Sequence, residues 1–95
     1  MFIFALLLTY LQQVDMPCLI KIDGIKICVY SNDHVPPHIH AIFGEYEAII
    51  AIREVEVIRG ELPTNKSRLA LDYVRDNQND LLESFYQLNP HIAQL

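Results

Sequence analysis

The sequence predicts an α+β fold: a small antiparallel β-sheet of four or five strands, followed by one long or two consecutive C-terminal helices packed on one face. Three observations predict this class. Apolar and polar residues alternate before Pro63, as in strands with one buried face. Asp23-Gly24 and Gly44-Glu45 are typical of tight turns between neighbouring strands. After Pro63, apolar residues recur at helical spacing.

The predicted strands follow one another through short connections. We expect them at residues 19–22, 25–30, 38–43, 46–52 and 55–59. The segment "SNDHVPP" interrupts the alternation between the second and third strands. Gly60 and Pro63 are expected to end the β region, because both residue types break regular structure.

The helical region begins after Pro63. One face collects the apolar side chains that are expected to pack on the sheet: Ala70, Tyr73, Val74, Leu81, Phe85 and Leu88. Residues 77–79, "NQN", have weak helix propensity, so either one helix or two helices with a break there is expected. Asn89-Pro90 is expected to stop the helix.

Length and charge limit the function classes. The chain has 95 residues, which fits one domain, and 52% of them are hydrophobic, which argues against disorder. The net charge of −5 comes from 7 basic and 12 acidic residues. Binding of nucleic acid through bulk electrostatics is therefore disfavoured, but a small local RNA site is not excluded.

Residues 1–15 form an apolar N-terminal segment ahead of a single domain at residues 16–95. The apolar run lacks the basic start and the small-residue cleavage site of a signal peptide, and it is too short to span a bilayer. We interpret it as an accessory segment and leave open whether it is native. We expect a cytoplasmic protein in which Cys18 and Cys28 are reduced thiols, although a disulfide across the hairpin is geometrically allowed.

The stretch "NDHVPPHIH", residues 32–40, contains three of the four histidines. In a strand, His38 and His40 point to the same face, roughly 7 Å apart, while Ile39 faces the core. The two prolines fix the backbone of the preceding corner, where a cis peptide bond is allowed. The stretch is thus either a site or a stiff structural turn.

Three interpretations of this stretch remain open. In the catalytic one, His38 and His40 act as acid and base, with Asp33 and His34 completing the site. In the second, the same residues bind a metal ion; we favour this less and expect no cofactor. In the third, the histidines are structural strand residues in an interaction module. His91 lies outside the stretch and is expected at the surface.

Substrate-binding residues are expected beside the histidines. Arg53 and Tyr46 are the first candidates, for a phosphate and a base respectively, and Arg59 and Tyr30 are further candidates. Both residue types are also common at strand ends and in sheet–helix interfaces without a functional role.

From Met16 onward, the chain resembles a family of very small bacterial proteins that share a domain of unknown function. The resemblance is carried by "NDHVPPHIHAIFGEYEAIIAI", then "GELP", then the helical tail "LALDYVRDNQNDLLESFY". Family members often have tryptophan in the terminal helices, whereas this chain has none.

The resemblance implies the toxin component of a bacterial type II toxin–antitoxin module. The expected partner is a small cognate antitoxin protein, with RNA as the candidate target and a second copy of the chain as another candidate partner. No membrane partner is expected. The activity favoured is RNA-directed, similar to an endoribonuclease; the alternative is a non-catalytic protein-interaction module.

Overall fold

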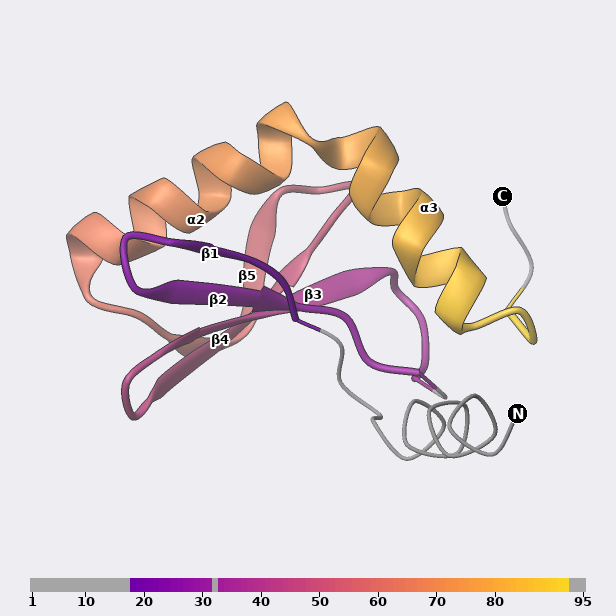
Figure 1. Cartoon of the computed structure of the whole chain (residues 1–95), viewed down its shortest axis with the longest axis horizontal. Coiled ribbons are helices and arrows are strands. Elements are labelled where there is room, and N and C mark those ends of the chain that lie inside the picture. The colour runs from indigo at the N-terminus through magenta and orange to yellow at the C-terminus, as the bar shows by residue number, and fades with distance from the viewer. Residues whose placement is uncertain (1–17, 32, 93–95) are drawn as a thin grey trace, which may run out of the picture.

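The computed structural model describes residues 18–31 and 33–92, which form a five-stranded antiparallel sheet and two helices (Figure 1). The sheet is a meander, so each strand pairs with the one that follows it in the chain. The strands are β1 (Cys18–Ile22), β2 (Ile25–Cys28), β3 (His38–Phe43), β4 (Tyr46–Ala51) and β5 (Glu56–Glu61). The predicted fold class is confirmed. The N-terminal segment, residues 1–15, lies outside the described residues.

The two predicted turns join neighbouring strands. Asp23 and Gly24, between β1 and β2, both have positive φ angles, 48° and 83°, as a two-residue hairpin turn requires. Gly44, between β3 and β4, has φ 59°. The second turn sets the register of the central hairpin, in which His40 lies opposite Ile49.

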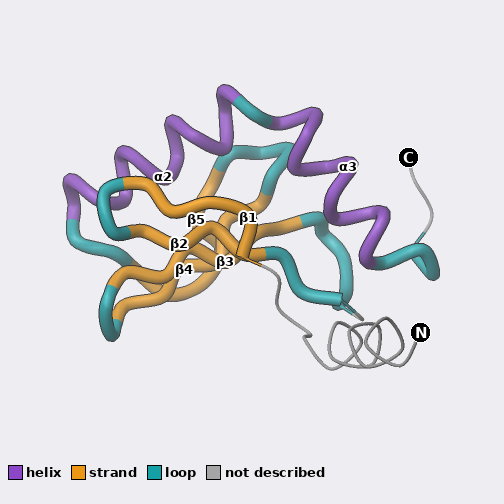
Figure 2. Tube along the Cα trace, viewed as in Figure 1, coloured by secondary structure: helices purple, strands orange, loops and turns teal. Residues whose placement is uncertain are grey.

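The helical region consists of two helices, α2 (Thr64–Asp76) and α3 (Gln78–Leu88), with the break at Asn77 (Figure 2). Of the two alternatives left open by the sequence, the broken one is therefore confirmed. The Asn77 side chain donates to the carbonyl oxygen of Tyr73 at 2.9 Å, and Gln78 donates to that of Ile52 at 2.9 Å. The first bond lies within the helical region, and the second joins the break to the residue that follows β4. Among the described residues, no helix is both long and apolar enough to cross a membrane.

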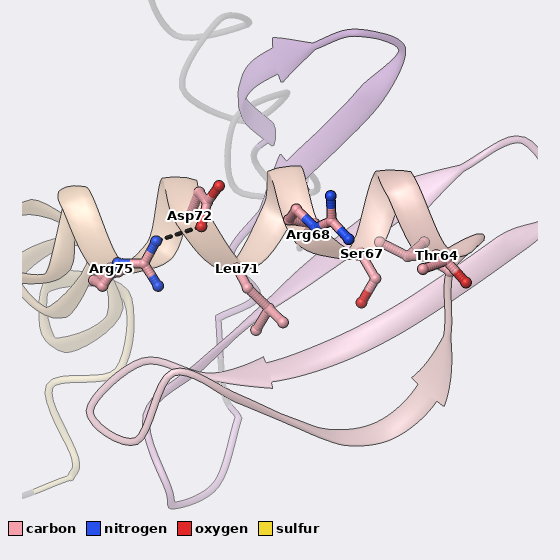
Figure 3. A pocket seen from close by; sticks show the side chains of 7 residues that line it. Thr64, Ser67, Arg68, Leu71, Asp72 and Arg75 are labelled. Atoms are coloured by element: carbon pink, nitrogen blue, oxygen red, sulfur yellow. Dashed lines mark hydrogen bonds and ion pairs between the residues drawn. The ribbon is translucent and has the colours of Figure 1, made fainter.

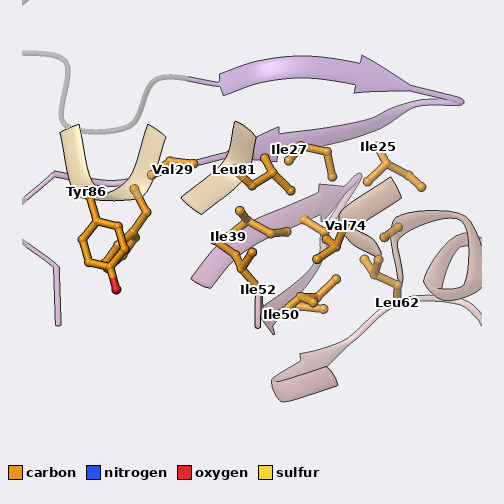
Figure 4. Close-up of a cluster of buried hydrophobic side chains, with 14 residues drawn as sticks. Ile25, Ile27, Val29, Ile39, Ile50, Ile52, Leu62, Val74, Leu81 and Tyr86 are labelled. Carbon is orange, nitrogen blue, oxygen red and sulfur yellow. The ribbon is translucent and has the colours of Figure 1, made fainter. Parts of the chain in front are cut away.

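The hydrophobic core lies between one face of the sheet and the two helices (Figure 4). Alternate residues of the central strands supply the sheet side of this core, since successive side chains of a strand point to opposite faces. The principal core residues are Ile25, Ile27, Val29, Ile39, Ala41, Ala48, Ile50, Ile52, Ala70, Val74, Leu81 and Phe85.

Two expectations about the β region are wrong. Cys18 and Cys28 lie opposite each other in the β1–β2 pair and form a disulfide, instead of remaining two thiols. Gly60 does not end the last strand, because β5 continues to Glu61. Gly60 has φ 75°, and the register shifts nearby, between Ile49 and Ile50 of β4, so the glycine accommodates an irregularity within the strand.

Candidate functional site

Three residues of the histidine stretch converge on one point. Oδ2 of Asp33 lies 2.8 Å from Nε2 of His38 and 3.6 Å from Nε2 of His40. One ligand atom from each of the three side chains lies within 4.8 Å of the others. We call Asp33, His38 and His40 the Asp-His-His cluster. The prediction that the two histidines share a face is confirmed, since His38 and His40 alternate with the core residues Ile39 and Ala41.

Asp33 is held in place by the end of α3, far away in the sequence. Its backbone N–H donates to Oδ1 of Asn89 at 2.5 Å. Nδ2 of Asn89, a fully buried residue, donates to the carbonyl oxygens of Tyr30 and Phe85, each at 2.9 Å. A single amide therefore ties the β2–β3 connection to the last turn of the helix.

His38 has an acceptor at each ring nitrogen. Nδ1 lies 2.6 Å from the carbonyl oxygen of Pro36, and Nε2 lies 2.8 Å from the Asp33 carboxylate. A carbonyl oxygen accepts only, so Nδ1 carries a proton that it donates to Pro36. The ring also lies beside Phe85, with centroids 5.6 Å apart. The peptide bond between Val35 and Pro36 is cis.

His40 is oriented by two contacts that leave one nitrogen unused. Nδ1 lies 2.8 Å from Oε2 of Glu47, and the ring stacks on Tyr30 with centroids 3.8 Å apart and planes 5° from parallel. His40 is 7% exposed. Within the described part of the chain, its Nε2 has no hydrogen-bond partner. A buried polar atom in that condition is uncommon, so this nitrogen is a candidate contact for a bound ligand or ion.

The cluster changes the proton affinity of two side chains. Burial alone would raise the pKa of Asp33, but the hydrogen bond from the His34 N–H and the charges of His38 and His34 outweigh it. The net result is a pKa below the usual aspartate value, so Asp33 is ionised near neutral pH. The pKa of Tyr30 is raised by burial, and secondarily by the carboxylates of Glu47 and Asp33.

A cavity of about 380 Å³ opens beside the cluster. The Asp-His-His cluster forms one part of its wall, and Tyr30, His34, Pro36, Ile49, Ile58 and Arg59 form the remainder. This wall belongs to the face of the sheet opposite the core, since His40, Ile49 and Arg59 occupy paired positions on β3, β4 and β5. The cavity thus combines buried titratable groups, an apolar wall and one guanidinium.

A family model described as a domain of unknown function (DUF4160) matches residues 24–86. The chain belongs to this family. Comparisons with curated proteins and with solved structures found no match. The matched part of the DUF4160 domain contains the whole Asp-His-His cluster and Glu47, while Asn89 follows it closely.

The other predicted site residues of the DUF4160 domain are not gathered at the cluster. His34 stands at the rim: its side chain is 82% exposed, and its Nε2 lies 3.6 Å from Oδ1 of Asp33. Arg53 and Tyr46 lie outside the lining of the cavity. The Arg53 guanidinium instead donates to the Tyr86 hydroxyl at 3.0 Å, on α3. The further candidates named from the sequence, Arg59 and Tyr30, occupy the cavity wall.

Two residues that support the cluster were not predicted from the sequence. Glu47 was expected only near the second turn, yet its carboxylate orients His40. Counting across the turn could have found it, because His40 pairs with Ile49 and Glu47 is two residues from Ile49, hence on the same face. Asn89 was assigned only to the end of the helix; a contact over 56 residues leaves no local signal. His91 is exposed as expected, although its Nε2 lies 3.0 Å from the Asp33 carbonyl oxygen.

A second hollow is lined mainly by side chains of α2, several of which are drawn in Figure 3. Its wall is formed by Leu62, Thr64, Ser67, Arg68, Leu71, Asp72 and Arg75. Asp72 and Arg75, one helical turn apart, form an ion pair there. The hollow contains no group of three metal-ligating side chains in the described residues, so it offers less chemistry than the cavity at the cluster.

Proposed function

We propose that the chain is the toxin of a bacterial type II toxin–antitoxin module and that it acts on RNA at the Asp-His-His cluster. The observation that carries the proposal is Nε2 of His40. This buried nitrogen has no hydrogen-bond partner among residues 18–31 and 33–92, and it converges with His38 on one carboxylate beside a cavity. A fold has no structural need for such an arrangement, because an unsatisfied buried nitrogen costs stability. A bound substrate or ion would give that nitrogen a partner.

The cavity wall favours a phosphorylated substrate with an aromatic or sugar portion. Arg59 provides a guanidinium suited to phosphate, while Ile49 and Ile58 supply apolar surface. A volume of about 380 Å³ accommodates a nucleotide-sized group. The net charge of −5 disfavours long-range attraction of RNA, so recognition would be local to this cavity.

The geometry favours a convergent centre over an acid and a base placed on opposite sides of a phosphorus atom. In-line phosphodiester cleavage by two imidazoles requires one near the attacking oxygen and the other near the leaving oxygen. Here Nε2 of His38 and Nε2 of His40 both approach Oδ2 of Asp33, so the three side chains act together on one bound group. His34, at the rim, is the fourth residue that we include in this site.

The antitoxin is expected to bind the open face and the sheet edges. Exposed apolar side chains lie on both edge strands: Leu19 and Ile20 on β1, and Ile58 on β5. Because Ile58 also lines the cavity, a protein that covered it would close the site. The same exposed side chains favour the rival function, a non-catalytic interaction module in which the cluster is only structural.

We place the protein in the cytoplasm, where RNA is available. The Cys18–Cys28 disulfide is the feature that counts against this placement, because a reducing compartment keeps thiols free. Titration of free thiols in protein quenched directly in intact cells separates the two cases. Two free thiols per chain fit the cytoplasm, and none would contradict it.

Induced expression in a bacterial host tests the function. Growth and total RNA integrity would be followed for the wild type, the His38→Ala/His40→Ala double variant and His91→Gln, with soluble protein levels matched. The proposal predicts growth arrest and RNA fragmentation by the wild type and by His91→Gln, and neither effect by the double variant. Arrest by all three with intact RNA would favour the interaction module. Intact RNA and normal growth with every variant would contradict the toxin proposal in that host.

A further inference from the structure

We propose that Asp33, His38 and His40 bind a divalent transition-metal ion, zinc being the best fit, through Oδ2 of Asp33 and Nε2 of each histidine. The three atoms already lie near the positions that such an ion needs. Ligand atoms around a tetrahedral zinc ion lie about 3.3 Å from one another. The observed separations from Asp33 Oδ2 are 2.8 Å to His38 and 3.6 Å to His40, on either side of that value.

Each histidine presents the correct nitrogen. A metal-binding imidazole usually donates its second N–H to a carbonyl or carboxylate oxygen, which fixes the tautomer and directs the lone pair of the other nitrogen at the metal. The Pro36 carbonyl oxygen lies 2.6 Å from Nδ1 of His38, and the Glu47 carboxylate lies 2.8 Å from Nδ1 of His40. When each ring is neutral and carries its proton on Nδ1, both Nε2 atoms direct lone pairs toward Asp33.

With both imidazoles neutral, three electron-rich atoms meet at this point. Oδ2 of Asp33 approaches both Nε2 atoms, and the Nε2 of His40, which is buried, has no hydrogen-bond partner in the described residues. A proton shared between Asp33 and His38 would satisfy one of these contacts and leave His40 unsatisfied. One divalent ion would satisfy all three at once.

The ligand set also indicates the kind of site. Two imidazoles and one carboxylate are typical of catalytic zinc, which keeps a position open for water or substrate. The neighbouring cavity gives that position room, with Arg59 and Ile58 on its wall. Stacking on Tyr30 holds the His40 ring in its plane and so limits the reorganisation needed for binding. His34 is exposed and lies outside the group of three, so it is not a ligand in this proposal.

The metal site stands on this geometry alone, and only the use of the ion depends on the function proposed above. There, a zinc ion would supply a bound water of lowered pKa facing the cavity. The two histidines would then act as ligands and not as an acid–base pair. The rim residue His34 and the guanidinium of Arg59 would remain available to contact substrate.

Zinc titration of the untagged full chain tests the site. Protein purified without chelator is analysed for bound metals, stripped with a chelator, dialysed, and titrated with zinc chloride by calorimetry. We expect one equivalent of zinc per chain for the wild type and for His91→Gln. This variant is the matched histidine control, because glutamine can still donate to the Asp33 carbonyl oxygen that His91 contacts. Glu47→Gln should weaken binding about 10- to 100-fold, because it removes the carboxylate behind His40. His40→Ala should abolish stoichiometric binding.

A second measurement covers the case in which His40→Ala does not fold. Cobalt(II) added to the wild type should give the visible absorption of a low-coordinate site with nitrogen and oxygen ligands, and zinc should displace it. The proposal would be overturned if folded wild type bound well under one equivalent of zinc. It would also be overturned if His91→Gln lost the zinc and His40→Ala kept one equivalent. Stoichiometric zinc with intact RNA would support the metal site and contradict the nuclease. RNA cleavage by metal-free protein would support the nuclease and contradict only the role of zinc in it.

Discussion

The two faces of the sheet differ in what their side chains do, although they share the same strands. On β3, Ile39 and Ala41 pack under the helices, while His38 and His40 point to the opposite face. The core face is apolar and is covered by helices α2 and α3 (Figure 4). The other face carries a buried cluster of titratable groups beside an open cavity. The side chains that build the core and those that form the cluster thus alternate along one strand.

The largest effect is expected from the core face. Phe85 on α3 is fully buried, and Phe85→Ala should lower the free energy of unfolding by about 3–5 kcal/mol through lost burial and the remaining cavity. Because the Phe85 ring also lies beside His38, zinc affinity should fall as well. Urea denaturation followed by circular dichroism measures the first effect. A loss below about 1 kcal/mol would show that α3 does not complete the core.

The second-largest effect is expected at Asn89, which connects the β2–β3 segment at the cluster to helix α3. Asn89→Ala removes the amide that joins the β2–β3 connection to α3, and leaves the Asp33 N–H and the carbonyls of Tyr30 and Phe85 unsatisfied. We expect a loss of about 2–3 kcal/mol in unfolding free energy, and weaker zinc binding because Asp33 is no longer held. Asn79→Ala, an exposed site on α3, is the matched control. Equal losses of unfolding free energy and of zinc affinity in the two variants would show that the hydrogen bonds of Asn89 do not support the cluster.

Gly60 and Gly44 allow a comparison of two backbone positions, one beside the partner of His40 and one in an open turn. Both have positive φ, which costs a residue with a Cβ about 1–2 kcal/mol. A Cβ at Gly44 meets nothing within 4 Å, whereas one at Gly60 would lie 2.1 Å from the Glu47 carbonyl oxygen. Gly60→Ala should therefore destabilise the protein more than Gly44→Ala and should also disturb Glu47, the partner of His40. Thermal unfolding of the pair checks the order, which the reverse ranking would contradict.

The smallest effect is expected at the rim of the open face. The His34 side chain is 82% exposed, so His34→Ala should change the unfolding free energy by no more than about 0.5 kcal/mol. Zinc stoichiometry should stay at one equivalent, since His34 lies outside the group of three ligands. Denaturation and zinc titration of this variant provide the check. Loss of zinc would place His34 among the ligands.

The sequence predicted the regular part of the fold and the shared face of the histidines. Both rest on local periodicity: alternation along residues 38–43 places His38 and His40 together, and helical spacing places Val74 and Phe85 in the core. The choice between one and two helices stayed open, because the weak propensity of Asn77 does not itself break a helix. Contacts with Tyr73 and from Gln78 to the end of β4 accompany the break.

The remainder of the site depends on contacts that no local pattern encodes. The position of Asp33 follows from its bond to Asn89, 56 residues away. Arg53 was the first phosphate candidate and Arg59 a further one, but the β4–β5 turn brings Arg53 to Tyr86 on α3. The irregular register near Ile49 and Gly60 brings Arg59 opposite Ile49 instead. Both outcomes depend on the register in which β4 pairs with β5, and the sequence alone does not specify that register.

A matched pair of neighbouring residues tests the division between the two faces most directly. Unfolding free energy and zinc stoichiometry would be measured for Ile39→Val and His40→Ala. We expect Ile39→Val to lose about 0.5–1.5 kcal/mol and keep one equivalent of zinc. His40→Ala, in metal-free protein, should lose about 1–3 kcal/mol, because the variant removes the hydrogen bond with Glu47 and the stacking on Tyr30, and it should bind no zinc. Loss of zinc in Ile39→Val, or stoichiometric zinc in a folded His40→Ala, would contradict the account.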